Sequence, residues 1–354
     1  MLLFLAVCLA GGAADDLELR DIVSQLQARV DAQDQVINAL RAQLMPANHP
    51  RVGGEACRTA PFAWPCAPSA EARTPARPFE QFERVMMVTA HPDDESIGSG
   101  TLARFAQLGR EVTIVCLTNG DKGTALLNVS STELARTRAI ELQRAAAALG
   151  AKAVMLGYED GNLQNTYEAR MRVAAQIRMH RPELLVTFNP QYNFNHFQYG
   201  TEHKDHKASG AIALDAFYPT ARDHLQFKEL WWPDQHRATL RKCCPELSNL
   251  TQPLQGWKVR EAYLFAAEKI GRVSGGNGGN YGNGAVRYET VEVALDDALL
   301  EKKARSLSMH VSQTGGASWQ ALLPDIRNHS AILGAASDTI TPYAEWFTRV
   351  VNMP

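Results

Sequence analysis

Between residues 85 and 188 the sequence alternates short apolar runs with longer amphipathic segments. The runs with strand character span residues 85–89, 112–117, 153–156 and 184–188, and the segments with helical character span residues 101–108, 132–149 and 168–179. Strands that alternate with helices in this way favour a parallel sheet covered by helices. We therefore predict an α/β fold with a Rossmann-like, doubly wound, mainly parallel sheet and helices on both faces.

The segments that follow are expected to complete the same domain, which we place at residues 84–354. Helices are predicted at residues 207–217, 299–310, 319–326 and 343–351, and a strand at residues 286–293. Gly and Asn dominate residues 271–284, a composition that cannot pack into a core and that predicts a mobile loop.

Three further segments are expected before this domain. Residues 1–14 are apolar and close in small residues, which favours a signal peptide, with a short anchor as the alternative. Residues 15–45 carry apolar residues at heptad spacing and predict a coiled-coil helix, hence a homo-oligomer formed through residues 19–44. A single amphipathic helix lying on the following domain is the other interpretation. Residues 46–83 are rich in Pro, Ala and Arg and predict a linker.

The N-terminal pattern and the charge balance bear on location and partners. A signal peptide predicts the secretory pathway, either the endoplasmic reticulum or secretion, and an anchor would add a membrane surface as a partner. The chain has 36 Lys+Arg against 38 Asp+Glu, for a formal net charge of -2. Because no basic field is available to hold a phosphate backbone, we do not expect a nucleic acid partner.

The six cysteines show no Cys-x-x-Cys spacing that would indicate a metal or redox motif. The adjacent Cys243 and Cys244, and the pair Cys57 and Cys66, allow disulfides. Cys116 lies in an apolar run and is expected in the core.

Polar residues collect where each of the four predicted strands ends, at residues 91–95, 118–121, 159–161 and 189–206. In doubly wound sheets, ligands bind in the crevice outside the carboxyl ends of the strands. We therefore expect these four groups to meet at one crevice.

The first group reads Ala90-His91-Pro92-Asp93-Asp94-Glu95. Carboxylates are costly to bury unless a cation compensates them, which favours a metal site here. Because Asp93 and Asp94 are neighbours, their side chains diverge, so that one can bind a metal ion while the other faces the reacting water. The alternative is a helix N-terminus with Ser96 as its cap, in which the helix dipole stabilises the acidic residues.

The second motif, His203-Lys204-Asp205-His206, opens the helix predicted at residues 207–217. Residues three apart share one helix face, so both histidines are expected to face the crevice. Together with His91 and Asp94 they offer nitrogen and oxygen ligands suited to Zn²⁺, with an open position for water. The sequence thus predicts a zinc site, with an exposed surface pair of histidines as the alternative.

Over roughly residues 84–319, these motifs resemble the LmbE-like and PIG-L zinc N-deacetylases. That family removes acetyl groups from N-acetylglucosamine in phosphatidylinositol glycolipids, bacterial thiol precursors and chito-oligosaccharides. The resemblance implies three zinc ligands and three catalytic residues. The implied ligands are His91, Asp94 and His206, and the implied catalytic residues are Asp93 as the base, His203 as the group that polarises the carbonyl, and Asp205 as the residue that orients a histidine.

Three shorter motifs extend the resemblance, namely Arg138-x-x-Glu141-Leu142, Asp160-Gly161 and His310-Val311-Ser312-Gln313. They imply that Arg138, Asp160 and His310 contact the substrate. From the residues alone, pairing of Arg138 with Glu141 across one helical turn is an equal alternative. Residues 193–202 depart from the family's pattern before its second histidine motif, which leaves the details of the substrate open.

The resemblance implies a zinc-dependent deacetylase that acts on an N-acetylglucosaminyl substrate. The first candidate is N-acetylglucosaminylphosphatidylinositol, the GPI precursor, and the second is a related glycoconjugate. A hypothesis from another class is a non-catalytic coiled-coil scaffold whose degenerate enzyme domain binds a sugar or a glycolipid.

Overall fold

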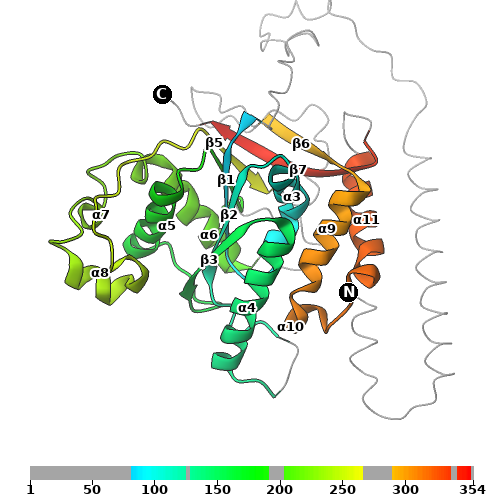
Figure 1. The fold of residues 1–354 in the computed structure, drawn as a ribbon, viewed down its shortest axis with the longest axis horizontal. Helices are drawn as coiled ribbons and strands as arrows, with labels where there is room; N and C mark the ends of the chain where they lie inside the picture. Colours follow the sequence, from blue (N-terminus) through cyan, green and yellow to red (C-terminus); the bar gives the residue numbers. More distant parts are fainter. Residues whose placement is uncertain (1–80, 125–127, 191–202, 266–288, 336–340, 352–354) are drawn as a thin grey trace, which may run out of the picture. The chain divides into compact units, whose positions relative to one another are not determined.

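The computed structural model describes residues 81–124, 128–190, 203–265, 289–335 and 341–351 (Figure 1). All described residues belong to one compact unit, Thr74–Pro354. The predicted signal peptide or anchor, the coiled coil, the mobile loop at residues 271–284 and residues 46–80 of the predicted linker lie outside the described residues. The end of the linker prediction, residues 81–83, is wrong, because Phe82 is fully buried in the core.

The described residues contain a seven-stranded sheet with the order β3-β2-β1-β4-β5-β7-β6. The first five strands run parallel, whereas β7 is antiparallel to both of its neighbours, β5 and β6. The strands are β1 (Arg84–Thr89), β2 (Glu111–Thr118), β3 (Lys152–Tyr158), β4 (Leu184–Thr187), β5 (Glu261–Phe265), β6 (Glu289–Leu295) and β7 (Tyr343–Val351). The predicted mainly parallel sheet is thus confirmed.

Helices cover both faces of the sheet, as Figure 1 shows. The first face carries α3 (Ser99–Gln107), α4 (Ser131–Leu149), α9 (Asp297–Ser308) and α11 (Trp319–Ala335). The second face carries α5 (Tyr167–His180), α6 (Lys204–Asp215), α7 (Lys228–Trp231) and α8 (Arg237–Cys243). Shorter turns are η3 (Asp94–Gly98), η5 (Ala216–Thr220), η6 (Pro245–Leu247) and α10 (Val311–Thr314).

The central strand β1 shows why two helical layers are needed. Val85 and Met87 belong to the apolar core under the first face, and Met86 and Val88 belong to the core under the second. Because successive side chains of a strand point to opposite faces, a continuous apolar run requires cover on both sides.

The helices change face between β1 and β4. The helices that follow β1 and β2 lie on the first face, and those that follow β3 and β4 lie on the second. In a doubly wound sheet this change opens a crevice at the carboxyl ends of the two strands. The residues after β1 and β4 are those that carry the two histidine motifs.

One predicted element is wrong. Residues 343–351, expected as a helix, form strand β7, which pairs with β5 on one side and β6 on the other. The reason is tertiary, because two neighbouring strands supply hydrogen bonds that override the weak local periodicity of this segment. The strand predicted at residues 286–293 is confirmed as β6, with its start at Glu289.

The described cysteines agree with their expected environments. Cys116 is free and fully buried, and Cys243 and Cys244 form a disulfide. Among the helices that the structure describes, none is long and apolar enough to cross a membrane.

Candidate active site

The turn after β1 carries a strained residue between its two metal-site candidates. Asp93 has φ 127° and ψ -21°, outside the regions that residues with a Cβ normally adopt. Such a conformation costs on the order of 1–3 kcal/mol and persists only where surrounding contacts impose it. Asp93, rather than Ser96, precedes the short helix η3, and its side chain makes no capping hydrogen bond. The capping interpretation of this motif is therefore wrong.

Asp94 faces back toward the strand that precedes it. Its Oδ2 accepts hydrogen bonds from the backbone N–H groups of Ala90, at 3.1 Å, and His91, at 2.7 Å. The side chain is only 8% exposed. These bonds hold the carboxylate between the histidines of the two motifs.

The second motif enters the site from the start of α6. His203 is the N-cap of this helix, and its Nδ1 accepts the backbone N–H of Asp205 at 3.2 Å. His206 lies in the first turn and stacks on Phe188, with ring centroids 4.2 Å apart and planes 9° apart. The prediction that both histidines lie on one helix face is therefore wrong, because His203 precedes the helix as its N-cap and only His206 is a helical residue.

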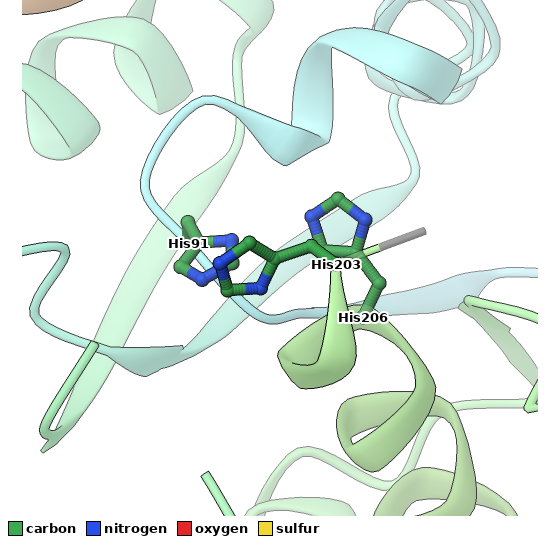
Figure 2. A group of neighbouring side chains, drawn as sticks. All are labelled: His91, His203 and His206. Atoms are coloured by element: carbon green, nitrogen blue, oxygen red, sulfur yellow. The ribbon is translucent and has the colours of Figure 1, made fainter. Parts of the chain in front are cut away.

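The three histidine rings converge, as Figure 2 shows. His91, His203 and His206 each offer a ring nitrogen, and these nitrogens lie within 4.8 Å of one another. The Asp94 carboxylate joins this group, with Oδ1 at 3.2 Å from His206 Nε2 and Oδ2 at 3.5 Å from His91 Nδ1. The structure therefore brings the predicted ligands together and places His203 beside them.

The other nitrogen of His91 faces two further carboxylates. Its Nε2 lies 3.1 Å from Asp160 Oδ1 and 3.4 Å from Asp205 Oδ2. Asp205 is fully buried and accepts the backbone N–H groups of Gly161 at 2.7 Å and Leu163 at 3.2 Å. A histidine that binds a metal through one nitrogen commonly donates the other N–H to a carboxylate. This arrangement assigns Nδ1 of His91 to the metal side and Nε2 to Asp160 and Asp205.

The charges of the cluster fit a bound cation. Burial favours a neutral His91 ring, yet the Asp160 and Asp94 carboxylates raise the pKa of His91 to about 10. Burial also works against ionised carboxyl groups, but hydrogen bonds from His206 and His91 lower the pKa of Asp94, and a hydrogen bond from His91 lowers that of Asp160 to about 2. Excess negative charge thus holds a proton on His91 that a metal ion would replace. Histidine nitrogens with a carboxylate oxygen are a donor set that suits zinc.

Asp93 lies beside this group, and its carboxyl pKa is shifted in the opposite direction from that of Asp94. Burial raises its pKa to about 7, the Asp94 charge adds to the rise, and Arg138 opposes it. A carboxyl group that titrates near neutral pH is matched to proton transfer under those conditions. His203 differs, because burial and the neighbouring His91 lower its pKa. Since Nδ1 of His203 accepts a hydrogen bond, the neutral ring carries its proton on Nε2 and can donate it.

Arg138 does not pair with Glu141. Its guanidinium donates to the carbonyl oxygens of Gly120 at 3.0 Å and Pro92 at 2.5 Å, and its Nη2 lies 3.1 Å from Asp93 Oδ2. The residue is 2% exposed, and a Cβ at Gly120 would lie 2.7 Å from the guanidinium. Arg138 was expected to contact substrate, and the structure instead packs it behind Asp93.

His310 is also enclosed within the protein. The side chain is fully buried, and its Nε2 lies 2.5 Å from Glu95 Oε1. Burial favours the neutral ring, but the Glu95 carboxylate raises the pKa of His310. The expectation that His310 contacts substrate therefore does not match its position, because no surface of the ring is open.

Sequence reasoning missed a buried ionic group behind the metal-site turn. Glu345 of β7 accepts the backbone N–H groups of Gly100 at 3.0 Å and Thr101 at 2.8 Å, and Lys303 lies 2.6 Å from it. Lys303 also donates to the carbonyl oxygen of Ile97 at 3.0 Å. The sequence does show Glu345 within the segment at residues 343–351. That carboxylate indicates a buried ion pair only if the segment is known to be a buried strand.

The fold and the site define a class of protein: a doubly wound α/β protein with a group of His and Asp side chains at its switch point that could hold a metal ion. Residues 86–217 match the family described as PIG-L: GlcNAc-PI de-N-acetylase, the family also called LmbE-like. The resemblance inferred from the motifs is thereby confirmed. The family and its named relatives are deacetylases, that is, amidohydrolases.

Two relatives and one solved structure illustrate the similarity. The chain is 27% identical over 259 residues to a 1D-myo-inositol 2-acetamido-2-deoxy-alpha-D-glucopyranoside deacetylase of Rhodococcus erythropolis, covering 65% of this chain and 81% of the relative. It is 33% identical over 141 residues to a diacetylchitobiose deacetylase of Thermococcus kodakarensis, covering 39% of this chain but only 51% of the relative. The structure of N,N'-diacetylchitobiose deacetylase from Pyrococcus horikoshii aligns with a TM-score of 0.56 at 22% identity, covers 78% of this chain and 86% of that chain, and shows the shared fold.

Proposed function

We propose that this chain hydrolyses the N-acetyl group of an N-acetylglucosaminyl substrate, with zinc held by His91, Asp94 and His206. The observation that carries the proposal is the convergence of these side chains at the switch point, next to a carboxyl group with a pKa of about 7. Zinc at such a site supplies Lewis acidity, which activates water at neutral pH and polarises the acetyl carbonyl.

The protein's own residues supply the proton transfers. Asp93 takes the proton of the attacking water and then passes a proton to the leaving amine. Arg138 holds the Asp93 carboxylate from behind, at 3.1 Å. His203 Nε2–H donates to the carbonyl oxygen as negative charge develops on it. Asp205, buried and hydrogen-bonded to the chain, fixes the ring of His91.

The finer identity of the substrate is part of the same proposal. The description of the matched family names GlcNAc-PI as the molecule that is deacetylated. The two relatives are named as deacetylases of an inositol glycoside and of diacetylchitobiose. The chemistry common to these names is a 2-acetamido-2-deoxyglucose unit. We place the GPI precursor first and a related glycoconjugate second, and we keep the secretory pathway as the proposed location.

The experiment measures metal content and acetate release on the purified full chain. Three substrates are compared: N-acetylglucosaminylphosphatidylinositol in detergent, the soluble N-acetylglucosaminyl inositol, and diacetylchitobiose. We expect one zinc ion per chain and release of acetate that a chelator abolishes and added zinc restores. A chain that binds sugar but holds no metal and releases no acetate would instead establish the non-catalytic scaffold.

Two variants separate the metal ligands from the base. His206→Ala should lose both stoichiometric zinc and activity, because it removes a ligand. Asp93→Asn should keep zinc and lose roughly 10²- to 10⁴-fold in turnover, the usual contribution of a positioned proton-transfer group. His329→Ala, on the exposed surface of α11, is the control and should match the wild type. An Asp93→Asn protein with a normal rate would exclude Asp93 as the base.

A further inference from the structure

We infer that His310 is a positioning residue that acts through Glu95 to hold Asp93 in the backbone conformation in which it serves as the base. The inference rests on the proposed function in one respect, since it takes Asp93 to be the proton-transfer group. It replaces the expected contact between His310 and substrate with an indirect role.

Glu95 links the two residues with its two oxygens. Oε1 lies 2.5 Å from His310 Nε2, and Oε2 accepts the backbone N–H of Asp93 at 3.0 Å. Glu95 and His310 are both fully buried. Each oxygen of the Glu95 carboxylate therefore contacts one of the two residues. Replacement of His310 should shift the Glu95 side chain and so weaken its hydrogen bond with the Asp93 N–H.

The Asp93 backbone needs such a restraint. At φ 127° the residue occupies a conformation that an L-residue leaves unless its neighbours prevent it. Its carbonyl oxygen accepts the N–H of Ser96 at 2.9 Å, and its carboxylate faces Arg138. The bond to Glu95 is the contact that holds its N–H, and this is the contact that His310 controls.

The contribution of the His310–Glu95 pair to stability does not by itself account for the pair. A buried ion pair contributes little net stability compared with apolar residues of the same shape, because both groups lose their hydration. His310 Nδ1 has, in addition, no hydrogen-bond partner among the described residues. Because the buried His310 leaves Nδ1 without a hydrogen bond to any described residue, its presence is better explained by the contact that its Nε2 makes with Glu95.

The backbone of His310 is itself anchored to the sheet's first helical layer. His310 is the N-cap of α10, and the next-but-one residue, Ser312, donates through its N–H and its hydroxyl to Glu141 of α4, at 2.8 and 2.6 Å. His310 and Glu95 are 215 residues apart in the chain, and His310 lies beyond the matched residues 86–217. The C-terminal part of the chain therefore completes the site through this contact.

The test compares two replacements of His310 in the full chain. His310→Gln keeps a side-chain N–H donor, whereas His310→Met has similar bulk and no donor. We expect His310→Met to lower kcat by about 10- to 100-fold, the size of effect that a small misplacement of a catalytic group produces, with KM within about twofold and zinc content unchanged. His310→Gln should recover most of the loss. His329→Met, the same change at an exposed site on α11, is the matched control and should behave as wild type.

A second readout does not depend on activity. Amide hydrogen exchange of the peptide that contains Asp93 should become faster in His310→Met and stay near the wild-type rate in His310→Gln. If the wild-type chain releases no acetate, the proposed function fails while this measurement still tests the positioning role. Should His310→Met not fold, Glu95→Gln has the same shape as the native side chain and should show the same loss of kcat.

The inference would be overturned by a His310→Met protein with wild-type kcat and unchanged exchange at Asp93. A loss expressed only in KM would also overturn it, because that result indicates direct contact between His310 and substrate. Loss of zinc from a folded variant would place His310 in support of the metal ligands instead.

Discussion

His91 uses its two ring nitrogens for different purposes. Nδ1 faces Asp94 and the metal-site histidines, and Nε2 faces Asp160 at 3.1 Å. A carboxylate on the far nitrogen fixes the tautomer of a metal-binding histidine and makes the ring a stronger ligand. Asp160, expected from the sequence to bind substrate, is thus placed to act through His91 on the metal ion that we propose.

Asp160→Ala should weaken zinc affinity by about 10- to 100-fold, because it removes the nearer of the two carboxylates that face His91 Nε2. Competition with a chelator of known affinity measures the change. Asp325→Ala, which removes an exposed carboxylate on α11, is the control and should bind zinc as the wild type does. Unchanged zinc affinity with a raised KM would return Asp160 to the role of a substrate ligand.

The group of side chains proposed to bind the metal could be predicted from the sequence, because each motif is contiguous and follows a recognisable strand. His91 and Asp94 lie within four residues of each other, and His206 opens a helix whose start the sequence indicates. The surroundings of Arg138 and His310 were not predictable in the same way. Their partners are Pro92, 46 residues away, and Glu95, 215 residues away, so only the folded chain shows that both side chains are buried behind the site.

At the scale of elements, the placement of α6 depends on one close approach to the end of β4. A Cβ at Gly210 would lie 2.3 Å from the carbonyl oxygen of Phe188, which is closer than packed atoms allow. Phe188 is also the residue on which His206 stacks. Gly210 therefore sets the distance between the helix that carries His206 and the strand end that it faces.

Gly210→Ala should destabilise the protein and displace its metal ligand. Alanine normally stabilises a helix relative to glycine by about 0.4–1 kcal/mol, but overpacking costs about 1–3 kcal/mol and should dominate here. Urea unfolding gives the stability, and chelator competition gives the zinc affinity, which should fall as well. Lys207→Ala, on the exposed surface of α6, is the matched control. A Gly210→Ala protein more stable than the wild type would show that α6 can move away from Phe188 without a loss of folding free energy.

The elements themselves were predictable to different degrees. The four strands from β1 to β4 and the helices between them follow from apolar runs that local sequence alone displays. Strand β7 was mistaken for a helix because Tyr343–Val351 mixes aromatic, charged and β-branched residues without strict alternation. Its pairing with β5 and β6 decides its conformation, and no local pattern reports such pairing.

At the scale of the whole molecule, the described residues build two apolar cores. The first core begins at Phe82, which is fully buried, and the second is closed by α5 to α8. The compact unit that contains both cores starts at Thr74.

A chain that starts at Thr74 should therefore keep the melting temperature, zinc content and kcat of the full chain. Calorimetry, metal analysis and acetate release check the three quantities. Sedimentation of both proteins tests the proposed coiled coil, since only the full chain should form an oligomer through residues 19–44. Loss of zinc or activity in the shortened chain would show that residues 1–73 contribute to the site.

The order of the strands also constrains how the protein is made. β7 follows β6 in the chain but lies between β5 and β6 in the sheet, and its Glu345 holds the N-terminus of α3 directly after the metal-site turn. While the ribosome is still translating, β6 has no β7 to pair with, and the turn that bears His91 and Asp94 lacks this anchor. The nascent chain is therefore expected to reach the proposed metal-binding geometry only after β7 has been made and has paired with its neighbours.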